Sequence, residues 1–333
     1  MKILYVLVFF FSFFISSDNY EVIEISEKKK KLSNEIFKKL SREHYVRNFK
    51  DKDFNKKYIE AVFERLDKEK NYFTQEEFNY FINNANQFEN NEYDIELAYE
   101  LINLYFEKLI IFQEFQIDLI ENSTFDFTIE EYLDIYEEDN IWQINLSDLR
   151  EIWRLETKND LLVAKLSDSA SDNPKKDILK RYKNRIRRIG QQKEEDIFSL
   201  AMNILTNQFD PHSSYLSPRS AEDFDMNMSL KLSGIGALLG VEDDYTKVIS
   251  LVPGGPAEKS GKIQPEDRIS KIKQKGDDEF TDVVGWRIDE VVDLIRGEID
   301  TEVQIEFISF ESDIDSTKIV TLKREEVKLE DRA

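Results

Sequence analysis

The spacing of apolar residues changes once along the chain, and this change limits the fold more than any other feature. From about residue 36 to residue 205, apolar residues recur at helical spacing, as in the stripe formed by Phe54, Tyr58 and Val62. After the turn-rich stretch Asp210–Pro218, short apolar runs alternate with Gly, Pro and Asp. The sequence therefore predicts an α+β multidomain chain, with an all-α N-terminal helical domain followed by a domain of short strands.

Local start signals support the helical half. Thr74 with Glu77, and Thr128 with Glu131, have the spacing of capping boxes, in which a hydroxyl and a carboxylate satisfy the first free backbone N–H groups. At positions 173–174 an Asn precedes a Pro, and Pro at the first helical position loses no hydrogen bond. We expect a helix to begin at each of these three places.

The second half predicts six strands and two helices. We expect a short helix after Pro256 and a longer one from Gly285 to Arg296, with Gly297 as its C-terminal cap. The expected strands are Met228–Leu232, Ala237–Val241, Lys247–Leu251, Arg268–Lys273, Val303–Phe310 and Lys318–Lys323.

Charge and cysteine content exclude several functions. The net charge is -22, which argues against nucleic acid because phosphate backbones are bound by neutralising Lys and Arg. The basic run from Lys175 to Arg188 carries apolar residues at helical intervals, so we expect the wet face of an amphipathic helix, with a phosphate or membrane-surface site as the alternative. The chain has no Cys and no pair of His at ligand spacing, so neither a metal nor a cofactor is expected.

The N-terminus has the form of a secretory signal. Met1 and Lys2 precede the apolar run Ile3–Ile15, and Ser16–Ser17 supply a small-residue end. The run is shorter than the roughly 20 residues of a membrane span, so no stable span is expected, and an uncleaved anchor is the alternative. Export without any cysteine suits a bacterial periplasm.

One short glycine-containing segment predicts an anion-binding loop. Gly234 and Gly236 bracket Ile235, and glycine lets a backbone approach a ligand closely. The amides of Ile235, Gly236 and Ala237 are therefore the candidate donors to the carboxylate that ends a peptide. The following strand, Ala237–Val241, offers an edge to which an extended peptide can add by main-chain hydrogen bonds.

An apolar pocket is predicted beside this loop. Ile288, Val292 and Ile295 recur at helical spacing and form one wall, with Ile235 and Leu239 opposite. This pocket should accept an apolar C-terminal side chain. The alternative is that the protein's own packing fills it and the module is purely structural.

No catalytic residue is predicted. The only two histidines are His44 and His212, and the latter lies between Asp210 and the serines Ser213–Ser214. This imitates the content of a catalytic triad, but a triad needs residues that converge from separate segments beside an oxyanion hole. We expect this stretch to be a linker or docking loop.

The chain resembles a known family, the tail-specific or C-terminal processing proteases of the bacterial periplasm. The resemblance rests on Asp210–Pro218, Gly234–Ala237, Val252–Ala257, Gly285–Val292 and Leu329–Ala333, and upstream on Arg65–Asp67, Asn71–Phe73 and Phe125–Thr128. It implies a signal peptide at 1–17, a helical domain at 18–208, a junction at 209–227 and a PDZ domain at 228–325. The PDZ domain would be a small β-barrel or sandwich with two helices, and residues 326–333 would begin a truncated peptidase region.

The resemblance implies that this chain is the substrate-recognition portion of a periplasmic tail-specific serine protease. Such proteases use a Ser and Lys pair beyond the PDZ domain, and no position of this sequence corresponds to either residue, so the chain alone is expected to be inactive. The expected partners are apolar C-terminal tails of exported proteins and, if the gene is split, a separate peptidase chain. The alternative is a stand-alone exported PDZ adaptor without a proteolytic role.

Overall fold

The computed structural model describes residues 20–45, 52–87, 93–133, 141–166, 173–229, 231–309 and 317–328. The predicted signal peptide at 1–17 and the segment Leu329–Ala333 lie outside these residues. The chain divides into two compact units, Met1–Ser217 and Pro218–Ala333. The division falls inside the junction expected at 209–227.

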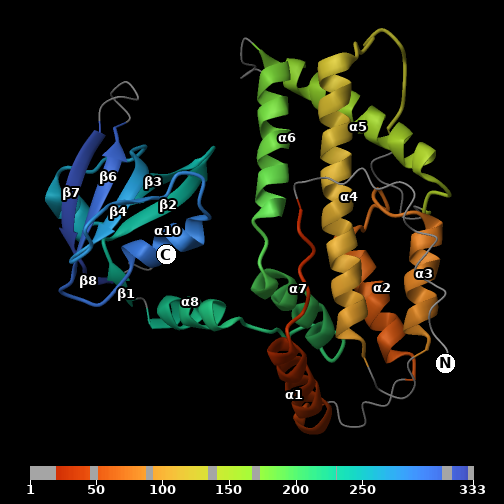
Figure 1. Ribbon diagram of the computed structural model, residues 1–333, viewed down its shortest axis with the longest axis horizontal. Helices are drawn as coiled ribbons and strands as arrows, with labels where there is room; N and C mark the ends of the chain where they lie inside the picture. Colours follow the sequence, from red (N-terminus) through yellow and green to blue (C-terminus); the bar gives the residue numbers. More distant parts are fainter. Residues whose placement is uncertain are drawn as a thin grey trace. The chain divides into compact units, whose positions relative to one another are not determined.

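The first unit is built from helices, which confirms the predicted all-α domain (Figure 1). Its helices are α1 (Glu27–Glu43), α2 (Phe54–Leu66), α3 (Gln75–Ala85), α4 (Ile95–Asn122), α5 (Leu146–Leu166), α6 (Pro174–Gly190) and α7 (Glu194–Asn207).

Two of the three predicted helix starts are confirmed. Thr74 and Glu77 form the expected capping box at the start of α3. Asn173 caps α6, where its side chain accepts from the Lys176 N–H at 3.1 Å. Helix α6 buries Ile178 and Tyr182, so the basic run does lie on the outer side of an amphipathic helix.

The predicted start at Thr128 is wrong. No helix follows this residue in the described stretch up to residue 133. The N–H and the hydroxyl of Thr128 both donate to Asp126, at 2.8 and 2.7 Å. The Glu131 carboxylate pairs instead with Arg154 and Lys158 of α5. Because Arg154 and Lys158 bind the Glu131 carboxylate, it is not available to accept from the Thr128 N–H as a capping box requires.

Aromatic side chains fill the core of the first unit, as their helical spacing indicates. Phe63 is 1% exposed and packs edge-on against Phe73, Phe78 and Trp142, with ring centroids 5.0 to 5.4 Å apart. Perpendicular ring pairs of this kind are favourable beyond the area that they bury. The aromatic stripes are therefore packing surfaces of the core.

The second unit is an antiparallel sheet with helices, as expected for its fold class. It contains α8 (Pro218–Ser229), β1 (Lys231–Gly234), β2 (Ala237–Glu242), β3 (Tyr245–Leu251), α9 (Pro256–Ser260), β4 (Arg268–Gln274), β5 (Thr281–Asp282), α10 (Ile288–Ile295), β6 (Glu302–Ile308), β7 (Thr317–Lys323) and β8 (Glu325–Lys328). The main sheet has the order β2-β3-β4-β6-β7, with β5 beside β4 and a separate β1-β8 pair. Within the described residues the sheet stays open between β2 and β7, so the predicted barrel is not closed.

Three expectations about the second unit need correction. Helix α8 runs to Ser229, so the first expected strand forms only from Lys231 onward. The long helix begins at Ile288 rather than Gly285. Gly297 is no left-handed cap, because α10 ends on Arg296 in an extended conformation and Gly297 has no positive φ.

Candidate functional site

The loop Gly234–Ala237, which we call the tail loop, joins β1 to β2 through a left-handed turn. Gly236 has a φ of 71°, a conformation that favours glycine. The carbonyl of Ile235 accepts from the Ala257 N–H at 2.8 Å, and that of Gly236 accepts from the Val252 N–H at 2.9 Å. Both carbonyls therefore point into the domain.

The carbonyl directions fix the amide directions. A trans peptide group is planar, and its N–H points opposite to its C=O. The N–H groups of Gly236 and Ala237 consequently point away from the partners of those carbonyls. Outside helices and strands, no backbone hydrogen bond among the described residues uses the N–H of Ile235 or Gly236. Successive amides around a left-handed residue form a concave site for anions.

The tail loop is tightly supported from within. A Cβ atom on Gly236 would lie 3.1 Å from the Gly255 Cα and 3.4 Å from a methyl group of Val327. Val327 belongs to β8, whose pairing with β1 holds the strand that enters the loop. The left-handed φ and these close contacts make glycine at position 236 a requirement of the fold itself.

The backbone of β2 is free on one side. Strand β2 ends the main sheet and pairs only with β3 among the described strands. The Gly236 carbonyl faces Val252 on the β3 side, and alternate residues of an antiparallel strand face opposite sides. The N–H and C=O groups of Ala237, Leu239 and Val241 therefore face away from β3. We call this row the β2 edge.

Helix α10 contacts β2 and divides its apolar residues between core and surface (Figure 1). Val291 and Ile295 are 0% and 3% exposed and belong to the core of the second unit. Ile288 and Val292 are partly exposed. The sheet thus covers only part of the apolar face of α10, and Ile288 and Val292 lie outside the buried core.

The five predicted pocket residues are therefore not equivalent. Ile235 is 3% exposed and packs in the same core as Ile295, so neither offers much side-chain surface. Leu239 is partly buried against that core. Leu239, Ile288 and Val292 are the predicted pocket residues that retain exposed apolar surface.

Two acidic residues of α10 are engaged by arginines that lie outside the helix. Arg219 of α8 pairs with Asp293 at 2.7 Å and donates to the Asp289 carbonyl at 2.9 Å. Arg287 donates to the Asp289 carboxylate at 3.0 Å. Burial alone would raise the pKa of Asp289, but the hydrogen bond from Arg287 and the two arginine charges lower it. The helix therefore presents paired charges beside its exposed apolar residues.

The histidines do not form a catalytic triad. His44 Nε2 lies 3.8 Å from Asp210 Oδ2 and 3.4 Å from Ser213 Oγ. A triad needs the orienting carboxylate and the nucleophile on opposite ring nitrogens, whereas both groups here approach the same one. His212 instead donates its backbone N–H to Asp210 Oδ1 at 2.8 Å. Sequence analysis missed that His44 meets this loop, because the two segments are remote in the chain.

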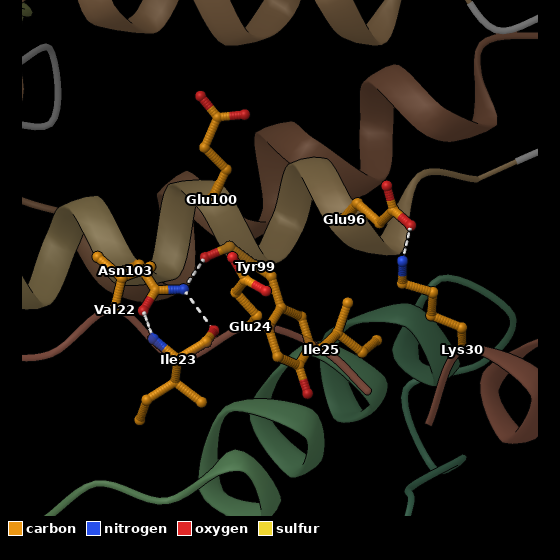
Figure 2. Close-up of a pocket in the computed structure, with 9 residues that line it drawn as sticks. All are labelled: Val22, Ile23, Glu24, Ile25, Lys30, Glu96, Tyr99, Glu100 and Asn103. Atoms are coloured by element: carbon orange, nitrogen blue, oxygen red, sulfur yellow. Dashed lines mark hydrogen bonds and ion pairs between the residues drawn. The ribbon is translucent and has the colours of Figure 1, made fainter. Parts of the chain in front are cut away.

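A hollow in the first unit serves to anchor the chain's extended N-terminal segment (Figure 2). Asn103 of α4 accepts from the Ile23 N–H at 2.9 Å and donates to the Ile23 and Tyr99 carbonyls at 3.1 and 2.8 Å. Lys30 pairs with Glu96 across the same hollow. These polar groups are used within the protein.

No group of three or more His, Asp or Glu in the described ranges could hold a metal ion. No helix within those ranges has both the length and the apolarity needed to cross a bilayer.

Comparisons with known proteins assign both units. Residues 36–219 match the tail specific protease N-terminal domain, and residues 223–307 match the PDZ domain. The chain is 31% identical over 312 residues, or 93% of its length, to a tail-specific protease of Haemophilus influenzae. It is 32% identical over 153 residues, or 45% of its length, to the carboxy-terminal processing protease CtpA of Bacillus subtilis.

The chain spans only part of these relatives. It covers 44% of the Haemophilus protein and 31% of the Bacillus protein. A solved PDZ domain of a carboxy-terminal protease from Vibrio cholerae, in complex with a peptide, is 40% identical; the match covers 30% of this chain and 99% of that chain, with a TM-score of 0.28.

Proposed function

Because the chain belongs to the tail-specific protease family, we propose that its second unit binds the C-terminal tails of exported proteins at the tail loop and the β2 edge. The observation that carries this proposal is the orientation of the Gly236 and Ala237 amides. Both point away from the Ala257 and Val252 amides that bind the neighbouring carbonyls, at the start of a strand whose outer edge pairs with no described strand.

Recognition has two parts in this proposal. The amides of Ile235, Gly236 and Ala237 donate to the terminal carboxylate, and hydrogen bonds to a charged group are stronger than those to a neutral one. The tail then adds to the β2 edge as an extra antiparallel strand. Its last side chain lies among Leu239 and the exposed α10 residues Ile288 and Val292. The absence of a free charge on this wall favours an apolar last residue.

We propose that this unit supplies substrate recognition within a longer proteolytic system in the bacterial periplasm. The relatives named as proteases extend well beyond the matched residues. The described part of the chain brings together no nucleophile, base and oxyanion hole. We therefore assign no catalytic residue to it, and we expect hydrolysis to need residues of a peptidase domain.

The test compares two forms of one peptide. Labelled peptides that end in Ala-Ala are titrated with the protein by fluorescence anisotropy, with either a free or an amidated C-terminus. We expect the free carboxylate to bind at least about tenfold more tightly, since charged hydrogen bonds contribute about 1.5–3 kcal/mol each. Equal affinity for both forms would rule out the proposal.

A pair of variants tests the apolar wall. Ile288→Asp should weaken binding of apolar tails by about tenfold or more, because a carboxylate there repels the tail and removes apolar contact. Ile319→Asp is the matched control, since Ile319 is an exposed isoleucine on β7 at the opposite edge of the sheet. Equal losses in the two variants would argue against the assigned wall.

A further inference from the structure

An exposed apolar surface lies at the far end of the β2 edge. Val241 is 55% exposed and Trp286 is 42% exposed. The Gly285 N–H donates to the Asp244 carbonyl at 2.6 Å, which joins the loop before α10 to the turn that follows β2. Trp286 follows Gly285 in the chain, so its backbone is held beside the turn that follows β2, at the end of the strand that carries Val241.

The direction of a bound tail follows from the position of the tail loop. If the terminal carboxylate binds at the start of β2, the preceding residues must extend toward the end of β2, antiparallel to it. Residues of an added strand pair with the edge at every second position. The last residue of the tail then lies opposite Ala237, the third from the end opposite Leu239, and the fifth from the end opposite Val241.

Strand spacing carries the fifth residue to the exposed surface. Four residues of an extended strand span about 14 Å. Side chains of paired residues lie on the same face of a sheet. Ala237 and Leu239 pack toward the core of the second unit, and Val241 shares their face because side chains alternate along a strand. The fifth side chain thus points to the same face as Ala237 and Leu239, at the end of β2 where the bond between Gly285 and Asp244 holds the start of the Trp286 segment.

We propose that Val241 and Trp286 form a second apolar contact, which selects tails with an apolar residue five positions from the C-terminus. This inference rests on the proposed tail binding and extends it from the last residue to an upstream one.

Several charges around this surface are paired within the domain. Arg287 is bonded to Asp289, and Glu242 accepts from Lys247 and Arg268, each at 2.9 Å. Trp286 keeps 42% of its surface exposed, which leaves part of the indole available to a ligand side chain. Asp243 and Asp244 in the adjoining turn are exposed, which makes a basic tail residue the rival to an apolar one.

The experiment varies one position of the tail. Labelled ten-residue peptides end in Ala-Ala and carry Leu, Ser or Lys as the fifth residue from the end. We expect Leu to bind about three- to tenfold more tightly than Ser, from the burial of a few methyl and methylene groups. Tighter binding of Lys than of Leu, or equal binding of Leu and Ser, would overturn the inference.

Variants locate the effect. Trp286→Ala and Val241→Ser should each reduce the Leu-to-Ser ratio to below about twofold, because each removes part of the apolar contact. Ile319→Ala, at the other edge of the sheet, should leave the ratio unchanged. A ratio that survives both Trp286→Ala and Val241→Ser would overturn the inference, even if tails still bind.

Tryptophan fluorescence adds a direct readout. The difference between the emission of the wild type and of Trp286→Ala isolates the Trp286 signal. We expect the Leu tail to shift this signal to shorter wavelength and the Ser tail to leave it in place; no shift with the Leu tail would contradict the contact. The amidated peptide separates the two proposals. Equal affinity for the free and amidated peptides would contradict tail binding itself. Tighter binding of the free peptide, with equal affinities for the Leu and Ser tails, would contradict only this inference.

Discussion

Arg324 lies so close to Gly297 that a Cβ atom at position 297 would stand 2.9 Å from the Arg324 Nε. The arginine is 3% exposed and donates to the carbonyls of Ile295 and Leu294, at 2.7 and 2.9 Å. These carbonyls belong to the last turn of α10 and have no partner within the helix. Arg324, which lies between β7 and β8, thus caps the C-terminus of α10, the helix that flanks the β2 edge.

The first prediction concerns Arg324. Arg324→Lys should destabilise the second unit by about 2–4 kcal/mol, since a lysine cannot reproduce the forked geometry and leaves buried acceptors unsatisfied. Urea denaturation measures the loss. Arg268→Lys is the control, because its ion pair with Glu242 is more than a third exposed and should cost less than about 1 kcal/mol. Similar losses in both variants would contradict the role assigned to Arg324.

The second prediction separates two explanations of Gly297. Gly297→Ala should cost about 1–3 kcal/mol, because the new methyl group collides with the buried guanidinium. Gly297→Asn decides the cause. A left-handed cap tolerates Asn better than Ala, whereas crowding by Arg324 makes the larger Asn side chain at least as costly as Ala. Greater stability of the Asn variant in urea would restore the cap predicted from sequence.

Gly297 also shows how far local sequence reasoning reaches. A glycine after an apolar helix pattern predicts a cap, and nothing nearby in the sequence signals a buried arginine. Elements with their own periodicity, such as α4 and α6, were predictable because their pattern is local. Contacts between remote segments, such as Gly297 with Arg324 or His44 with Asp210, depend on the fold as a whole.

The candidate site shows the same limit. The spacing of Ile288, Val292 and Ile295 places all three on one face of a helix, as the sequence predicts. Which part of that face the sheet covers depends on where the helix crosses it. The sequence could not separate the buried Ile295 from the partly exposed Ile288 and Val292.

The third prediction concerns the anchor in Figure 2. Asn103→Leu keeps most of the side-chain volume but removes the bonds to Ile23, to the Tyr99 carbonyl and to the Tyr20 hydroxyl. The Ile23 amide should then exchange its hydrogen at least about tenfold faster, as expected when an opening costs about 1.4 kcal/mol less. Hydrogen exchange with mass spectrometry measures this. Asn122→Leu, at the exposed end of the same helix, should leave the rate unchanged, and equal acceleration in both variants would contradict the anchor.

The last prediction uses an unusual carboxyl group in the first unit. The Glu156 side chain accepts from Asn71 Nδ2 at 3.1 Å. Burial, together with the charges of Asp160 and Asp67, raises its pKa to about 7, although the Arg185 charge acts in the opposite direction. A raised carboxyl pKa favours the folded state only while the group is protonated. The contribution of Glu156 to the free energy of unfolding is therefore complete when the pH is below the pKa of the unfolded state, near 4.5. It is lost as the pH rises through the folded-state pKa of about 7.

Glu156→Gln should remove this pH dependence. Its amide oxygen can still accept from Asn71, and the buried charge no longer forms. We expect the variant to gain about 1–3 kcal/mol in free energy of unfolding at pH 8 and to change little at pH 4.5, as measured by urea denaturation. Glu151→Gln is the control: Arg154 lowers the pKa of Glu151, so this variant should show no gain at pH 8. An equal gain at both pH values for Glu156→Gln would show that the effect is not a titration of Glu156.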